Sequence, residues 1–219
     1  MKKLYILPQY IYSFQASTKL VDDTLSLLRN EEEEYVKNSG NFHSTDLSDR
    51  KEFRKLKKWF NKCLRECLED LNTDQHISDV KVCLMWGNKS NYNQWHHTHT
   101  HPQSILSGIL YLTDNDSRTW FSIRNIWTNF SNNTEEKWPR NFPSVFAGED
   151  KVTKSTLYSN NDVIHKEQTK SGHLVIFPSH LIHSVDENLS KHSRYSVSFN
   201  SFFSGQVGDN SSLSKVVFE

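Results

Sequence analysis

The hydrophobic pattern changes from a helical period to a strand period near residue 75. Between Leu47 and Leu71 the apolar residues recur every three or four positions among Lys, Arg and Glu, which predicts an amphipathic helix with one buried face. A shorter helix is predicted from Asp22 to Val36. Beyond these, alternating or continuous apolar runs predict strands at 80–86, 105–112, 120–123, 173–177 and 195–199. Helices followed by many short strands predict a mainly β fold, a sandwich or barrel of sheets with helices packed outside.

The length predicts one domain. A chain of 219 residues with 35% hydrophobic content can bury one sizeable core. We expect 1–75 to be a mostly helical buttress and 76–205 to form the sheets, with a long insert at 113–171. That insert is rich in Asn, Ser, Thr and Lys, and long connections of this kind are often lids. Its scattered aromatic residues, which we expect to wall a substrate site, are Trp120, Trp127, Phe130, Trp138, Phe142 and Phe146.

Charge and cysteine content exclude several classes. The 26 basic and 26 acidic residues cancel without a long basic block, so binding to nucleic acid is not supported. Neither a signal-peptide core nor a run of about 18 apolar residues is present, and we expect a soluble, cytoplasmic protein without a membrane partner. Three cysteines, Cys63, Cys67 and Cys83, are too few for a disulfide framework and are assigned no chemistry.

A histidine cluster in the middle of the chain points to a metal. Four of the six residues from His96 to His101 are histidines, and His97, His99 and His101 alternate with other residues. Alternate side chains of a strand share one face, so these three imidazoles are expected to line one surface at a spacing suited to a metal ion. A solvated edge strand or a polar loop would also explain the pattern.

A second segment offers a remote ligand. His183 follows a predicted strand and a turn marked by Pro178, and a hairpin there would bring it beside the strand of His99 and His101. Eleven residues further on, Arg194 begins a strand in which alternation places Ser196 on the same face. A guanidinium with a hydroxyl two residues away suits a carboxylate, although for a single arginine taken alone a surface salt bridge is the favoured explanation.

Three motifs in order resemble a known family. They begin at His99-x-His101-Pro102-x-Ser104-x-Leu106-Ser107-Gly108-x-x-Tyr111, continue at Gly172-x-Leu174-x-x-Phe177-Pro178-Ser179-x-x-x-His183-x-Val185, and end at Arg194-x-Ser196-x-Ser198-Phe199-Asn200. This set resembles the 2-oxoglutarate- and Fe(II)-dependent oxygenases of bacteria and phages. The earlier Gly40-Asn41-Phe42-His43-Ser44 is also similar to an element of that family.

The resemblance implies a double-stranded β-helix, or jelly-roll, with iron at its mouth. It implies His99, His101 and His183 as metal ligands, with Arg194, Ser196 and Tyr111 binding the far carboxylate of 2-oxoglutarate. Such a dioxygenase consumes O2, converts 2-oxoglutarate to succinate and usually hydroxylates its substrate, here an unidentified small molecule or protein side chain. The oligomeric state is left open, with a homodimer among the alternatives.

One position departs from the usual pattern of the superfamily. His101 stands where an Asp or Glu is common, so three neutral imidazoles would hold the ion and its identity is open. The departure also permits His97 with His99 as the proximal pair, and we prefer His99 with His101 because the family motif continues from there. His96 and His97 would then support the ligands or contact substrate.

Two other functions remain open from the sequence. One is a cupin-type three-histidine metalloenzyme, although Gln103 and Ser104 stand where cupins usually carry a Glu. The other is a non-enzymatic jelly-roll module in which His97, His99, His101 and His183 hold a structural zinc. Four protein ligands would favour zinc, whereas an open position facing Arg194 would favour the oxygenase.

Overall fold

Two antiparallel sheets and two α-helices make up the described part of the fold. The computed structural model describes residues 10–30, 35–38, 41–71, 77–122, 163–209 and 214–218. The major sheet contains, in spatial order, β1 (Tyr12–Gln15), β9 (His173–Pro178), β6 (Leu106–Tyr111), β11 (Arg194–Asp209), β4 (Ile77–Ser90), β3 (Asn41–His43) and β2 (Val36–Asn38), while β12 (Ser214–Phe218) pairs with β11. The minor sheet contains β5 (His96–His99), β10 (Ile182–Val185), β7 (Asn115–Ser122) and β8 (Val163–Thr169).

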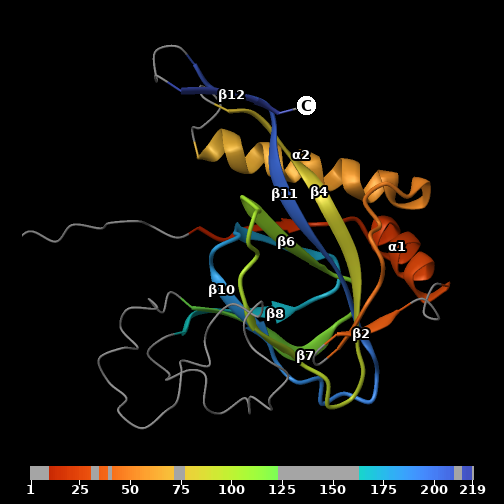
Figure 1. Ribbon diagram of the computed structural model, residues 1–219. Coiled ribbons are helices and arrows are strands. Elements are labelled where there is room, and N and C mark those ends of the chain that lie inside the picture. Colours follow the sequence, from red (N-terminus) through yellow and green to blue (C-terminus); the bar gives the residue numbers. More distant parts are fainter. Residues whose placement is uncertain are drawn as a thin grey trace, which may run out of the picture.

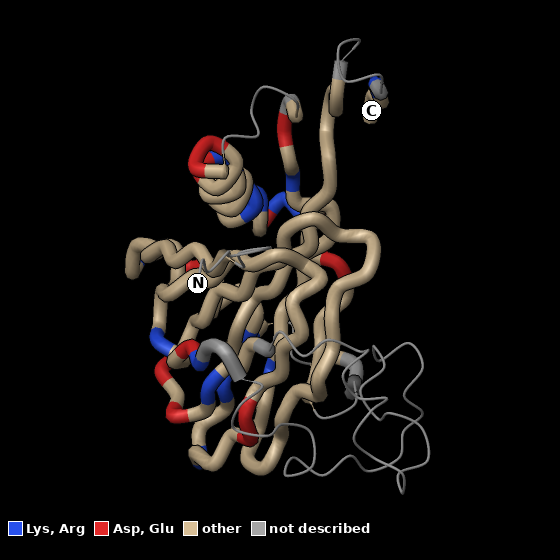
Figure 2. Tube along the Cα trace, turned by 90° about the vertical axis from the view of Figure 1, so that its left-hand side faces the viewer, with Lys and Arg blue, Asp and Glu red and all other residues tan. Residues whose placement is uncertain are grey.

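Both helices lie on the outer face of the major sheet (Figure 1). They are α1 (Thr18–Asn30) and α2 (Arg54–Asp70), the second preceded by the 3-10 turn η2 (Lys51–Phe53). The minor sheet faces the other side of the major sheet, so the predicted architecture of a jelly-roll with helices outside is confirmed. Acidic and basic residues are interspersed in Figure 2, as the balanced composition predicts. None of the described helices is long and apolar enough to cross a membrane.

The major sheet separates two apolar cores. The larger core packs the helices on the sheet, and the apolar residues predicted for the long helix, from Phe53 to Leu68, are buried in it. Phe60 of α2, for example, contacts Phe199 of β11 with ring centroids 4.6 Å apart. The smaller core lies between the two sheets and consists of Ile109, Tyr111, Phe121, Val175, Phe177 and Leu181. Two residues of this second core, Ile109 and Tyr111, also line the candidate site.

The amino-terminal segment differs from the prediction. The first helix runs over Thr18–Asn30 instead of 22–36, because Ser17 caps its start by accepting a hydrogen bond from the Leu20 N–H at 3.3 Å. Residues expected in its last turn begin β2 instead. Short strands β1, β2 and β3 were not predicted, since three or four residues are too few to establish an alternation.

The turn after Pro178 is not a hairpin. β9 belongs to the major sheet and β10 to the minor sheet, so the chain crosses between sheets at this corner. The predicted hairpin is therefore wrong, although the corner still carries His183 to β5. The predicted insert begins and ends in paired strands, because β7 and β8 are neighbours in the minor sheet. Trp120 lies in β7, whereas Trp127, Phe130, Trp138, Phe142 and Phe146 lie outside the described residues.

An irregularity in β4 decides which of its side chains reach the site. The pairing with β11 shifts between Asn200 and Ser201, which leaves Cys83 without a partner residue. A bulge of this kind reverses the alternation beyond it. Val80 and Val82 are buried under the helices, but so is Met85, and Leu84 is 40% exposed. The alternation of buried residues in the predicted strand 80–86 is therefore interrupted after residue 82, where Met85 and not Leu84 is the next buried side chain.

Candidate metal and cofactor site

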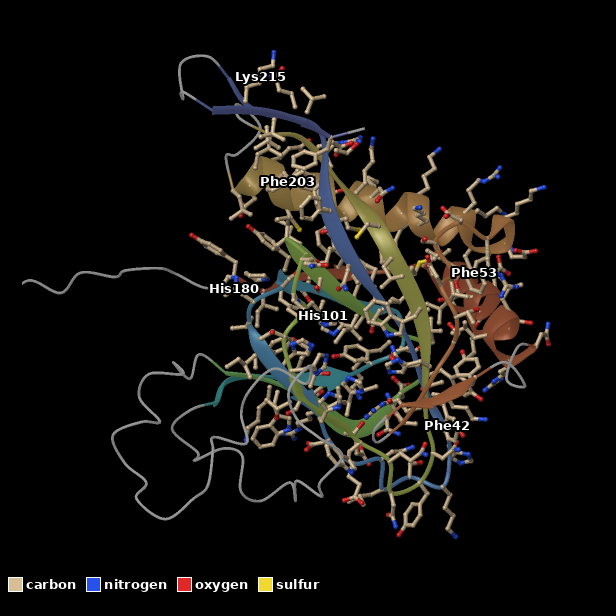
Figure 3. All side chains as sticks on the ribbon, viewed as in Figure 1. Phe42, Phe53, His101, His180, Phe203 and Lys215 are labelled. Carbon is tan, nitrogen blue, oxygen red and sulfur yellow. The ribbon has the colours of Figure 1, made fainter. Side chains whose placement is uncertain are left out.

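Three imidazoles from separate segments meet between the sheets. His99 ends β5 and lies opposite His183 of β10 in the strand register. His101 follows in a loop that is held by a 2.8 Å hydrogen bond from its own N–H to the carbonyl of Ser179. One ring nitrogen from each of the three histidines lies within 4.8 Å of the other two. Figure 3 labels His101 in the interior between the sheets.

Backbone carbonyls fix two of these rings in one tautomer. The Nδ1 of His99 lies 2.8 Å from the carbonyl oxygen of His97, and the Nδ1 of His183 lies 2.9 Å from that of Leu181. Since a carbonyl only accepts, each Nδ1 carries the proton and each Nε2 keeps its lone pair. Burial lowers the pKa of both His101 and His183 to about 3, and that of His99 well below its usual value. All three rings are neutral near pH 7 and able to bind a cation.

The donor set fits a transition-metal ion. The Nε2 atoms of His101 and His183 are 3.2 Å apart. Two nitrogens that bind one ion at about 2.1 Å, at an angle near 100°, would be separated by about the same distance. Neutral imidazole suits Fe, Zn, Cu and Ni. No carboxylate joins either histidine group found in the described part of the chain, so the expected departure from two histidines and an acid is present in the structure.

A cavity that is partly open to solvent lies beside these imidazoles. Its lining residues are Asn41, Trp86, Asn88, His96, His99, His101, Ile109, Tyr111, His183, Val185, Arg194, Ser196 and Ser198. The six predicted site residues are therefore brought to one cavity.

Arg194 is a buried cation at this cavity. It is 5% exposed, and it donates from Nη1 to the Ser117 hydroxyl and, at 3.2 Å, to the carbonyl of Asp186, and from Nη2 to the Ser90 hydroxyl at 2.9 Å. No described carboxylate pairs with it, and no described residue accepts from its Nε–H or from the second Nη2–H. A guanidinium with N–H groups left over can bind a carboxylate through paired charge-assisted hydrogen bonds. Burial lowers the pKa of Arg194 only to about 10, so the charge persists at neutral pH.

Two hydroxyls stand next to this cation. Ser196 and Tyr111 lie directly opposite each other in the pairing of β11 with β6. The phenol of Tyr111 forms a 2.6 Å hydrogen bond with the Thr119 hydroxyl, and burial raises its pKa, so it remains protonated. The Ser196 hydroxyl accepts a long hydrogen bond of 3.4 Å from the Asn88 amide.

Sequence reasoning missed several wall residues. Trp86 donates from its indole N–H to the Asn88 side chain at 3.2 Å, and the Asn88 amide donates to the Ser198 hydroxyl at 2.9 Å. The bulge in β4 turns both residues toward the cavity, and nothing in a simple alternation predicts this. Asn41 carried a signal, because it belongs to the Gly40–Ser44 element that resembles the family.

The alternation expected for the histidines is also broken. Between β5 and β10, the pairing passes from His99 opposite His183 to His96 opposite Val185, so three steps on β5 match two on β10. His96 therefore lines the cavity with His99, and His97, which was expected there, does not. The four-histidine zinc set is not assembled in the described part of the chain. It holds two groups of three instead, His99 with His101 and His183, and His99 with His96 and His97.

Comparisons with known proteins agree with this geometry. A family model described as "Putative 2OG-Fe(II) oxygenase" matches residues 84–200. Comparison with curated protein sequences finds no significant match.

Among solved structures, a prolyl-4-hydroxylase from Pseudomonas putida is similar with a TM-score of 0.57 and 11% identity over 88% of this chain and 91% of that one. HygX from Streptomyces hygroscopicus, crystallised with nickel and 2-oxoglutarate, has a TM-score of 0.58 and 12% identity over 87% and 82%. The epimerase SnoN of nogalamycin biosynthesis has a TM-score of 0.60 and 10% identity over 92% and 82%. At these identities the structures support the jelly-roll fold, and the family model covers more than half of the chain. The chain therefore belongs to the 2OG-Fe(II) oxygenases, enzymes that depend on iron and 2-oxoglutarate.

Proposed function

We propose that His99, His101 and His183 bind the iron of this oxygenase, that Arg194, Ser196 and Tyr111 bind the far carboxylate of 2-oxoglutarate, and that the reaction hydroxylates a substrate still to be identified. One observation carries the proposal: a single cavity has three neutral imidazoles and a buried arginine without a carboxylate partner among the described residues. The substrate class stays between a small molecule and a protein side chain, with O2 as co-substrate.

The protein's own part in this reaction is to bind and orient 2-oxoglutarate and to exclude water from the reacting centre. When bound, the iron would supply the oxidising chemistry with O2 as the oxidant, while 2-oxoglutarate would be converted to succinate and CO2. Arg194 offers two parallel N–H donors to a carboxylate, and the neutral phenol of Tyr111 and the hydroxyl of Ser196 lie beside it. Ile109, Val185 and Trp86 form apolar wall around the imidazoles, which limits water at the reacting centre.

Anaerobic titration of 2-oxoglutarate into the Fe(II)-loaded protein tests the roles of these residues. We expect the wild type to develop a metal-to-ligand charge-transfer band and, once air is admitted, to release succinate even without substrate. Arg194→Ala should weaken 2-oxoglutarate binding by about 100-fold or more with unchanged iron content, since two charge-assisted hydrogen bonds are lost. Arg118→Ala, at an exposed arginine of β7, is the matched control and should bind normally.

The ligand assignment has its own variant. His183→Ala removes the ligand supplied by β10 and should abolish the charge-transfer band that 2-oxoglutarate gives with iron, because the proposed iron set is then incomplete. An unchanged band in this variant would reject His183 as a ligand. Unchanged 2-oxoglutarate affinity in Arg194→Ala would remove the arginine from the cofactor site.

A further inference from the structure

His97 has a buried ring nitrogen for which the proposed iron site has no use. Its Nδ1 is inaccessible to solvent and has no hydrogen-bond partner among the described residues. A buried polar nitrogen without a partner is costly, and such atoms call for an explanation such as an ion. The ring of His97 lies 4.8 Å from that of His96 and 5.3 Å from that of His99, centroid to centroid.

The two neighbouring rings present lone pairs. The Nδ1 of His96 lies 3.2 Å from the Asn41 side-chain oxygen, which accepts its proton and leaves Nε2 as an acceptor. The Nδ1 of His99 is likewise bound to a carbonyl, so only its Nε2 can bind an ion. One ring nitrogen from each of His96, His97 and His99 lies within 4.8 Å of the others, which is the same limit that the proposed iron ligands meet.

The irregular pairing of β5 is what makes this second group. In a regular strand, residues three apart point to opposite faces, but the extra residue in β5 puts His96 and His99 on the same side. His96 and His99 line the cavity and His97 does not, so the second group extends from the cavity wall toward His97. It shares His99 with the group that contains His101 and His183.

We propose that His96, His97 and His99 form a second binding set for a divalent transition metal, and that an ion there competes with the proposed iron set because His99 has one available nitrogen. The second set is inferred from the contacts of its own three histidines. Its competition with iron rests on the proposed function, in which His99 is also an iron ligand. Three imidazoles without a carboxylate bind Ni2+, Cu2+ and Zn2+ more tightly than Fe2+, and this order applies to both sets. An ion of these metals in the second set would occupy the available nitrogen of His99 and leave the proposed iron set incomplete.

Zinc binding by single and paired variants tests the proposal. The probe is Zn2+ alone, added to metal-free protein and measured by titration calorimetry and by metal content after desalting. We expect one ion per chain in the wild type, one in His97→Ala and one in His101→Ala, because each variant keeps one complete set. His97→Ala/His101→Ala should bind at least tenfold more weakly than either single variant. His192→Ala, at an exposed histidine, is the control.

Each alternative outcome has a separate meaning. Loss of zinc in His101→Ala alone would overturn the second set. Loss of zinc in His97→Ala alone would leave the second set and overturn the proposed iron set. Two ions in the wild type would overturn the sharing of His99. Glutamine at the same positions replaces any alanine variant whose circular dichroism departs from that of the wild type.

Discussion

The orientation of two of the proposed metal-binding imidazoles depends on the backbone two residues away. His99 donates from Nδ1 to the carbonyl of His97, and His183 donates from Nδ1 to that of Leu181, so both strands use the same local contact. Metal-binding histidines usually fix their second nitrogen in this way. Because the acceptor is backbone, substituting the side chain at 97 or 181 does not remove it. This is why His97→Ala is a usable variant for the zinc experiment.

A single hydrogen atom at residue 108 allows β6 to pass under the aromatic core. A Cβ on Gly108 would overlap the ring of Phe199 and lie 3.2 Å from the Val175 carbonyl. We expect Gly108→Ala to lower the free energy of unfolding by about 1–3 kcal/mol in urea titrations, as overpacking does. In a Phe199→Leu background, which frees space beside residue 108, Gly108→Ala should cost less stability than it does in the wild type. Equal urea midpoints for wild type and Gly108→Ala would contradict the close approach.

At the scale of elements, a buried group of hydroxyls joins the two segments that carry His101 and His183. The Ser179 hydroxyl lies 2.8 Å from that of Ser107 and 2.7 Å from that of Ser104, while its carbonyl accepts the N–H of His101. The corner between β9 and β10 is thereby tied to the loop between β5 and β6. These contacts make Ser179 a positioning residue for both imidazoles.

Ser179→Ala should therefore weaken metal binding more than a purely structural change would. In a His97→Ala background, where only the proposed iron set is complete, we expect the dissociation constant for Zn2+ to rise about tenfold, within the range found for groups that support metal ligands. Ser179→Thr, which retains a hydroxyl, should recover most of the affinity. Ser204→Ala, at a serine on the far part of β11 whose hydroxyl accepts a hydrogen bond from Lys81, is the control. Unchanged affinity in folded Ser179→Ala would limit the hydroxyl group to a packing role.

At the scale of the whole molecule, helices and site share the major sheet but lie on opposite faces of it. The proposed ligands come from β5, β10 and the loop after β5, whereas α2 packs on the other side. If the chain is one domain, metal binding must stabilise the helices as much as the site. Zn2+ at about 100 times its dissociation constant should add about 2.7 kcal/mol, or roughly 5–10 °C in melting temperature.

The melting temperatures measured by helical circular dichroism and by tryptophan fluorescence should both rise by this amount. Trp59 reports from α2 and Trp86 from the cavity wall, so both layers are represented in the fluorescence. His99→Ala, which interrupts both histidine groups, should show no shift with either probe. A helical transition that stays in place while the fluorescence transition moves would show two separate folding units.

Local pattern was sufficient for most elements and for the chemistry of the site. The apolar residues from Phe53 to Leu68 predicted α2. A helix that buries one face repeats apolar residues every three or four positions, and this repeat is visible in the local sequence. The long apolar runs predicted β6, β9 and the first part of β11 for the same reason. The resemblance of the ordered motifs to the oxygenase family implied which three histidines and which arginine would gather, and the structure places them around one cavity.

Tertiary structure decided which face each side chain takes and which sheet each strand joins. The irregular pairings in β4 and β5 arise from the match with β11 and β10, and they turn Trp86, Asn88 and His96 into the cavity against the local alternation. The passage of β10 into the minor sheet depends on its partners β5 and β7, which lie tens of residues away. Side-chain period is a property of one strand, whereas register and sheet membership belong to a pair of strands. For this reason the sequence determined which histidines are present, whereas only the pairing of β5 with β10 placed His99 in both histidine groups.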